Sequence, residues 1–323
     1  MLSKRALSNT RPNDIKNIMS KGHINSHFSI TKRCLTYGDG SVGSDELRQS
    51  IANFMNNTAF RPRRPLELND VTVLAGVSSI IDSLAFCLCE AGEGILLGRP
   101  TYVGFISDLV NRAGVKPVLV GFEGQSRLID PTSLEAVKYY EDALIQSTHN
   151  GTPVRALLLC HPHNPFGLCY EPQDFCSNGI RLGAFVSQAN PKLHAAMRAI
   201  SKFAWPSSLA DTAWCAILND ASFLTKYFQT LRERLSTAYE HCVALLKQHD
   251  IPYVPAHAGP FIWIDLSKHL SSHTLEAERE LAWRMIDNKV WLATGEAYRS
   301  ERPGWFRITF AVDEVELELG IQR

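Results

Sequence analysis

The sequence lacks three features that would place it in a simple class. Its 33 lysine and arginine residues are balanced by 33 aspartate and glutamate residues, so there is no net basic field to hold a nucleic acid. No apolar run approaches the roughly 20 residues of a membrane span, and the polar segment 1–24 lacks the apolar centre of a secretory signal. These absences predict a soluble, cytoplasmic protein that binds neither nucleic acid nor membrane.

Paired cysteine motifs are absent as well. The eight cysteines lie mostly in apolar stretches, and none forms the CxxC spacing that would hold zinc. We therefore expect free, buried thiols in a reducing compartment. His161 and His163 have the chemistry of metal ligands, but they stand beside prolines without other obvious ligands, so we expect no metal site in this loop.

The first two thirds of the chain alternate between strand and helix patterns. Short apolar runs typical of buried strands are separated by apolar residues at helical spacing. The expected strands are 71–74, 94–98, 116–120 and 154–160, and the expected helices are 44–56, 78–89 and 104–113. This alternation favours a mostly parallel sheet whose ligands bind beyond the carboxyl ends of its strands.

The last third reads differently. Apolar residues step by three or four from Phe223 to Leu246, which predicts one long amphipathic helix ending near Gln248. Expected strands at 261–264 and 305–310 then surround an expected helix at 274–288. The length suggests two cores, so we predict two domains preceded by an N-terminal arm (1–30). The first is a large ligand-binding domain (31–220), and the second consists of the long helix with a small α+β domain (221–323).

Several glycine-rich motifs are candidate binding sites. Residues 38–43 match the dinucleotide pattern GxGxxG, but no buried strand precedes them, so we reject that interpretation. The turn 75–79 opens a helix with two hydroxyls and free amides, which suits an anion, although Ser is also a common helix cap. Arg181 stands between Gly179 and Gly183, glycines that would let a ligand approach the backbone. Each motif alone is a weak signal.

The order of the motifs is more specific than any one of them. The segments 37–40, 75–79, 98–102, 163–167, 178–183 and 303–307 together resemble the class I and II aminotransferases of pyridoxal-phosphate (PLP) fold type I. The resemblance covers most of the chain and looks closest to the fungal branch similar to 1-aminocyclopropane-1-carboxylate (ACC) synthases, which includes aminotransferases and carbon–sulfur lyases of secondary metabolism. It implies an α/β fold with a large, mostly parallel sheet domain and a smaller α+β C-terminal domain.

The resemblance also implies a cofactor, a substrate and a partner. The cofactor is pyridoxal 5'-phosphate, the substrate an amino acid or a compound derived from one, and the partner a second copy of the chain in a homodimer. Two serines and an arginine would hold the phosphate, an aromatic residue would stack on the pyridine ring and an amide would bond the ring oxygen. The implied cofactor contacts are Ser78, Ser79, Tyr102, Asn164, Arg181 and, across the dimer, Tyr37. Arg307 would bind the substrate α-carboxylate.

The departures from the family pattern concern catalysis. The family's Schiff-base lysine directly precedes an Asp-Phe pair, and here that position is Gln173, which cannot attach PLP covalently. The segment that joins Asn164 to this region is shortened to Pro165–Pro172, and with it the aspartate for the pyridine nitrogen is lost. A second gap lies between Ile18 and Ile24. Both junctions are abrupt, so we infer that whole coding blocks were lost or skipped in the gene model.

Two expectations follow from these gaps. The central gap, after about residue 172, should remove two buried strands of the large sheet and leave apolar edges on both sides. The chain as printed should be inactive, although it belongs by resemblance to PLP-dependent aminotransferases. Carbon–sulfur lyase or ACC-synthase-like chemistry of an intact relative stays open, as do a non-catalytic pseudoenzyme and a truncated gene product.

Overall fold

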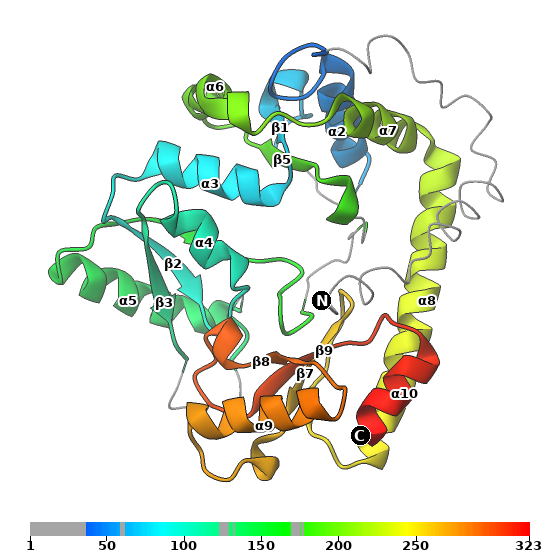
Figure 1. Ribbon diagram of the computed structural model, residues 1–323. Coiled ribbons are helices and arrows are strands. Elements are labelled where there is room, and N and C mark those ends of the chain that lie inside the picture. Colours follow the sequence, from blue (N-terminus) through cyan, green and yellow to red (C-terminus); the bar gives the residue numbers. More distant parts are fainter. Residues whose placement is uncertain (1–36, 59–61, 123–128, 132, 169–174, 176–177) are drawn as a thin grey trace. The chain divides into compact units, whose positions relative to one another are not determined.

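The computed structural model describes residues 37–58, 62–122, 129–131, 133–168, 175 and 178–323 (Figure 1). The predicted N-terminal arm, the gap near Ile18 and the position of Gln173 lie outside the described residues. The chain divides into two compact units, of which the first is Met1–Leu88 with Ser177–Thr230 and the second Cys89–Cys176 with Leu231–Arg323. This division does not use the boundary at residue 220, and the predicted domains stay a prediction.

The first unit is built around a two-stranded antiparallel sheet. Strand β1 (Val71–Leu74) pairs with β5 (Gly183–Val186), with Leu74 opposite Gly183. All four residues of β1 are buried, as the apolar run predicts. The helices of this unit are α2 (Asp45–Asn56), α3 (Val77–Leu88), α6 (Pro191–Ile200) and α7 (Ser208–Asn219). The predicted helices at 44–56 and 78–89 are thus confirmed to within one residue.

A buried carboxylate fixes the start of α2. The hydroxyl of Ser44 accepts from the amide of Leu47 at 3.0 Å, which caps the helix. Ser44 in turn donates through its amide and its hydroxyl to Asp211 of α7, at 2.8 and 2.6 Å. Asp211 is buried, so these bonds join α2 to α7 across a long stretch of sequence.

The second unit contains a three-stranded parallel sheet. Strand β2 (Gly94–Gly98) lies between β3 (Lys116–Val120) and β4 (Val154–Leu158). Both neighbours run parallel to β2, as the strand and helix alternation predicts. Helices α4 (Gly104–Val110) and α5 (Val137–His149) belong to the same unit (Figure 1). The core beside α5 consists of Leu96, Val120, Phe122, Ile129, Ala136 and Tyr140.

The expectation that 154–160 is a continuously buried strand is corrected by β4. Its residues alternate between half-buried and exposed, and Leu157 and Leu159 are 42% and 48% exposed. Among the described strands β4 pairs only with β2, so one of its edges has no hydrogen-bonded neighbour there. This is the arrangement expected where interior strands are missing, because apolar side chains that such strands would cover are left open.

Two leucines near this strand edge should promote self-association. We expect the double substitution Leu157→Lys with Leu159→Lys to reduce aggregation of the purified chain, because charged side chains block strand pairing at an edge. Light scattering at fixed protein concentration measures the effect. Leu144→Lys with Ile145→Lys on α5 is the matched control, since those side chains are also exposed. An equal reduction of aggregation by both pairs of substitutions would show that strand pairing does not cause the aggregation.

The C-terminal part of the second unit is an antiparallel sheet covered by helices. Its strand order is β6 (Tyr253–Val254), β7 (Phe261–Asp265), β9 (Trp305–Thr309) and β8 (Ala293–Thr294). One face carries Ile262, Ile264, Phe306 and Ile308, and these pack with residues of α8 (Ala221–Gln248), α9 (Leu275–Asp287) and α10 (Glu314–Gln322). Figure 1 shows α9 running across this sheet. The long helix and the α+β arrangement are as predicted.

The opposite face of the same sheet carries a polar residue among aromatic ones. Arg307 of β9 lies opposite Trp263 of β7, and Trp263 packs with Phe166 and Tyr298. Arg307 therefore points to the side of the sheet away from the aliphatic core. Short helical turns complete the fold at Leu68–Asp70, Leu134–Ala136, Asn178–Ile180, Ser201–Phe203, Ser267–His269 and Glu296–Tyr298.

No helix within the described ranges is both long enough and apolar enough to cross a bilayer.

Candidate functional site

In the first unit, the turn between β1 and α3 presents the start of a helix. The chain leaves β1 at Leu74, turns at Gly76 and enters α3 at Val77. The first amides of a helix have no acceptor within it and carry the positive end of the helix dipole, so they attract anions. Ser78 is exposed and Ser79 half-buried. The Ser79 hydroxyl donates to the carbonyl of Ala75 at 3.2 Å, which leaves its oxygen able to accept.

Arg181 reaches the same turn from β5. The pairing of Leu74 with Gly183 brings the start of β5 to the end of β1. A Cβ atom on Gly76 would lie 2.9 Å from Nη2 of Arg181, so the guanidinium rests against the Gly76 backbone. Gly76 has φ +95°, and Arg181 itself has a left-handed φ of 60°, which is uncommon for a residue with a side chain. The fold thus brings Ser78, Ser79 and Arg181 to one place.

The glycine after Arg181 has a packing role. The sequence suggests that both flanking glycines let a ligand approach the backbone. A Cβ on Gly183 would lie 2.6 Å from the carbonyl carbon of Gly76 and 2.6 Å from the amide nitrogen of Val77, whereas one on Gly179 would meet nothing within 4 Å. Gly183 is therefore needed because the turn itself packs on it, and the ligand-approach interpretation is wrong for this residue.

In the second unit, Arg307 is the centre of a polar and aromatic cluster. Its Nη1 donates to Oδ1 of Asn164 at 3.1 Å, and its Cζ lies 3.8 Å from the ring centre of Phe261 and 5.1 Å from that of Tyr298. Its Nε is buried without a hydrogen-bond partner. Burial lowers the pKa of the guanidinium, but arginine stays charged in proteins. In the described part of the chain no carboxylate pairs with this cation, so the cluster suits an incoming anion.

Tyr102 stands beside this cluster. Its ring packs edge-on against Phe105, with 5.4 Å between ring centres, and covers Gly104. It lies near enough to Arg307 and Tyr298 to act on the pKa of both. The neighbouring Thr101 amide donates to the carbonyl of Tyr298 at 2.8 Å. The second unit thus brings together Tyr102, Asn164 and Arg307, three of the residues assigned by resemblance.

Two residues of the cluster were not predicted from the sequence. Phe261 and Tyr298 flank the guanidinium with aromatic faces that favour a cation, and burial raises the pKa of Tyr298 to about 12. Strand alternation could have found Phe261, because residues 261, 263, 305 and 307 share one face of a paired β7 and β9. Tyr298 lies in a short helical turn and gives no periodic signal.

His163, the residue before Asn164, has a buried ring. The ring is 4% exposed and stacks on Phe166 with 4.9 Å between ring centres. Burial lowers its pKa to about 4, so the ring is neutral at pH 7. Its Nδ1 has no partner, and within the described ranges no three potential metal ligands cluster.

Tyr37 lies on the turn before α2 in the first unit. Its side chain is 83% exposed, and its ring centre is 5.6 Å from that of Trp205. The last glycine of the GxGxxG pattern packs against β1, because a Cβ on Gly43 would lie 2.8 Å from Cβ of Val73. The predicted contact of Tyr37 with a neighbouring subunit stays a prediction.

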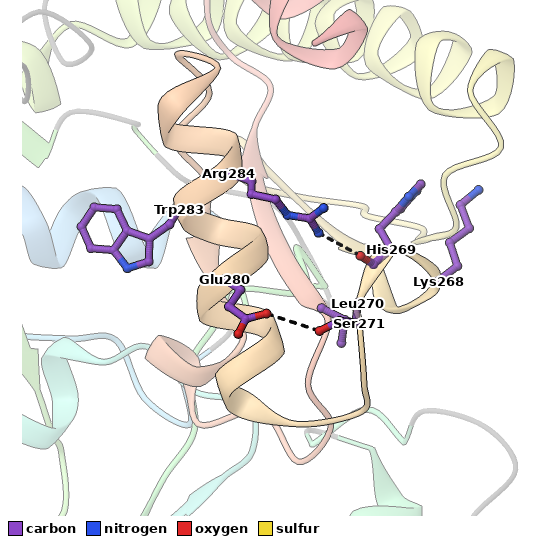
Figure 2. A pocket seen from close by; sticks show the side chains of 7 residues that line it. All are labelled: Lys268, His269, Leu270, Ser271, Glu280, Trp283 and Arg284. Atoms are coloured by element: carbon purple, nitrogen blue, oxygen red, sulfur yellow. Dashed lines mark hydrogen bonds between the residues drawn. The ribbon is translucent and has the colours of Figure 1, made fainter.

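None of these residues lines a large open pocket of the second unit. It has a volume of about 600 Å³ and lies between α9 and the segment 268–271 (Figure 2). Most of its polar groups already have partners: Arg284 donates to the carbonyl of His269 at 3.2 Å, Ser271 donates to Glu280 at 3.3 Å, and Lys268 donates to the carbonyl of Asp250. Figure 2 shows Trp283 on the side of α9 away from that segment. The pocket therefore offers no set of groups converging on one ligand.

Comparisons with known proteins identify the family. The family model for aminotransferase class I and II matches residues 10–178 and 173–323. A probable aminotransferase, gliI of Aspergillus fumigatus, is 28% identical and is covered over 82% of its length by 91% of this chain. The human probable inactive ACC synthase-like protein 2 is 27% identical, and here 87% of this chain spans only 59% of the relative.

Solved structures show the same fold at lower identity. A Thermus thermophilus aspartate aminotransferase mutant superposes with TM-score 0.72 at 16% identity, covering 88% of this chain and 86% of that one. The kynurenine aminotransferase of Pyrococcus horikoshii gives TM-score 0.73 at 15% identity, covering 98% of this chain and 86% of that one. The fold is that of the fold type I PLP-dependent transferases, with a parallel sheet.

Two details of the comparisons bear on the interior gaps. The family model matches in two pieces that overlap at residues 173–178, close to the gap expected after about residue 172. The alignment with gliI spans 365 positions, more than the 323 residues of the chain, so the relative has residues that this chain lacks. From the fold, the motif order and the family match over nearly its whole length, the chain belongs to the class I and II aminotransferases.

Proposed function

We propose that the chain is an aminotransferase-like protein that binds PLP without covalent attachment and does not catalyse transamination. The observation that carries the proposal is the contact between the Arg181 guanidinium and Gly76 at the start of α3. The forked, charged guanidinium lies there beside the first amides of the helix and the two serine hydroxyls. Together these groups are of the kind that binds a phosphate. The absence of a lysine at position 173 supports the loss of catalysis.

The residues of this chain fit parts of the cofactor and substrate. Ser78, Ser79 and Arg181 would hold the phosphate, while Tyr102 would lie on the pyridine ring and Asn164 would bond the ring oxygen. Arg307 would bind an α-carboxylate, because its Nε is buried without a hydrogen-bond partner and its guanidinium is flanked by aromatic rings. When bound in an intact family member, PLP supplies an electron sink for the amino acid. Two residues that this chemistry requires in the family have no counterpart in the sequence. They are the Schiff-base lysine and the aspartate that bonds the pyridine nitrogen.

Other parts of the proposal rest on the relatives. The name of the human relative, probable inactive ACC synthase-like protein 2, supports a non-catalytic role. The proposed setting in fungal secondary metabolism rests on the resemblance of the motif order, and gliI shows that a fungal probable aminotransferase is among the relatives. A homodimer in the cytoplasm with Tyr37 reaching the partner's phosphate completes the proposal. Two alternatives rest on the same residues: ACC-synthase-like or carbon–sulfur lyase chemistry in an intact form, and a truncated gene product that does not fold stably.

Replacing Arg181 tests the phosphate site. We expect Arg181→Ser to weaken PLP binding roughly tenfold or more, because one charge-assisted hydrogen bond contributes about 1.5–3 kcal/mol. The binding constant follows from titration of the PLP absorption band. Arg198→Ser is the matched control, since Arg198 is an exposed arginine on α6 of the same unit. Equal affinity of the two variants for PLP would show that Arg181 does not bind the phosphate. A native chain that binds no PLP would refute the proposed function.

A further inference from the structure

Helix α9 carries a carboxylate that is completely buried. Glu278 of α9 is 0% exposed. Its Oε1 accepts from the amide of Glu296 at 2.8 Å, and its Oε2 accepts from the amide of Gly304 at 2.6 Å. The neighbouring Arg279 pairs with the Glu296 side chain instead. Two backbone amides are thus the hydrogen-bond donors that the described residues offer to Glu278.

The two amides belong to the two segments that build the Arg307 cluster. Glu296 begins the turn Glu296–Tyr298, whose tyrosine ring lies over the guanidinium. Gly304 directly precedes β9, in which Arg307 is the third residue. One carboxylate therefore bonds, through its two oxygens, to both the strand that carries the cation and the turn that carries its aromatic neighbour.

The Gly304 end of this link has little freedom. Gly304 has φ +94°, and a Cβ there would lie 2.6 Å from Cα of Ser267. Its carbonyl accepts from the amide of Leu266 at 2.8 Å, so both polar groups of its backbone are bonded. Because β9 starts at the next residue, a shift of Gly304 would change the direction in which β9 presents Arg307.

Burial of this carboxylate has a physical cost that its two bonds offset. Desolvation raises the pKa of Glu278, the carboxylate of Glu296 acts in the same direction, and the two amide bonds and Arg279 oppose it. Only an ionised carboxylate offers both oxygens as acceptors, since glutamine would place an NH2 group against one of the two amides. Each amide left without an acceptor would be a buried unsatisfied donor.

We propose that Glu278 is a positioning residue for the anion site at Arg307. It acts through the backbone, holding β9 and the Tyr298 turn so that the guanidinium and its aromatic flank meet a carboxylate in one fixed geometry. The inference rests on the proposed role of Arg307 in binding a carboxylate.

The test measures anion binding by the full chain. Methanesulfonate serves as probe because it stays singly charged over the whole working pH range, and the Nε–H resonance of Arg307 reports its binding by NMR titration. We expect Glu278→Gln to weaken binding roughly tenfold, because small displacements of a binding group reduce its effect strongly. Glu278→Asp, which retains both acceptor oxygens, should recover part of the loss.

Two controls separate positioning from charge and from stability. Glu276→Gln removes a carboxylate from the same helix at a side chain that is 73% exposed, and it should leave methanesulfonate binding unchanged. Leu317→Ala removes a buried contact of α10 in the same unit and should lower the unfolding temperature without changing the affinity. Both results are required if Glu278 acts by placing Arg307.

The outcomes distinguish the inference from the function on which it rests. If the native chain binds methanesulfonate and Glu278→Gln binds it equally well, Glu278 has no positioning role. If Glu278→Gln and Leu317→Ala weaken binding in proportion to their loss of stability, the role is merely structural and the inference is wrong. If the native chain and Arg307→Leu are alike in not binding the probe, the assignment of Arg307 fails, and with it the role of Glu278.

Discussion

Supplied with PLP, an amino acid and a 2-oxo acid, the chain will form product no faster than PLP alone in solution. Enzymes accelerate their reactions by about 10⁶-fold or more, and we expect nearly all of that factor to be lost. The reason is chemical, because the amide of Gln173 is not a nucleophile and cannot take the place of a lysine amine. Spectrophotometric detection of the new 2-oxo acid measures the rate.

A lysine at the same position provides the matched comparison. Gln173→Lys restores an amine, and we expect it to allow covalent attachment of PLP, with little turnover because the aspartate for the pyridine nitrogen is still missing. Turnover by the native chain well above that of free PLP, abolished by Arg307→Leu, would contradict the prediction.

Gly183→Ala will destabilise the first unit by roughly 1–3 kcal/mol, the range typical of overpacking a tight contact. The added methyl group would lie 2.6 Å from the Gly76 carbonyl carbon and the Val77 amide nitrogen, and backbone atoms cannot move aside as a flexible side chain can. Since the same turn starts α3, PLP binding should weaken along with stability. Urea denaturation gives the free energy of unfolding.

The same motif contains its own control. Gly179→Ala adds the same methyl group where nothing lies within 4 Å, so its stability should stay within about 0.5 kcal/mol of the native chain, as for surface substitutions in general. Equal destabilisation by both substitutions would show that close packing of Gly183 on the turn is not what the motif requires.

The sequence pattern located elements whose signals are local. Strands β2 and β3 begin and end where the expected strands 94–98 and 116–120 do. Strand β2 is buried throughout, and a buried parallel strand reads as a continuous apolar run. Helix α7 and strand β5 were not predicted. They are set by distant partners, since α7 places Asp211 against Ser44 and β5 pairs with β1 from more than a hundred residues away.

The burial of β4 could not be read from its own residues. The run 154–160 is apolar enough for an interior strand, yet Leu157 and Leu159 are exposed. A strand's burial depends on its neighbours, and the gap expected after about residue 172 lies outside the strand itself. The prediction of missing strands, drawn from motif order, explains the exposure better than the composition of the strand does.

For the candidate site, motif order identified residues that the fold then grouped within each unit, but not the residues that support them. Glu278 is hidden in a helix with many charged residues. Its signal was present, because Glu278, Leu281 and Met285 share a face at helical spacing and the two apolar residues pack on the core. A glutamate on an apolar face is rarely buried without partners, so this spacing could have indicated a specific bond, although we did not predict one from the sequence.

The central claim is that this chain holds PLP by its phosphate and not through a covalent bond. The direct measurement is borohydride reduction of the chain mixed with one equivalent of PLP, followed by dialysis and peptide mapping by mass spectrometry. We predict that dialysis removes the absorption of the reduced cofactor from the chain and that no peptide carries a pyridoxyl group in stoichiometric amount. One lysine peptide that carries one pyridoxyl group per chain would contradict the claim.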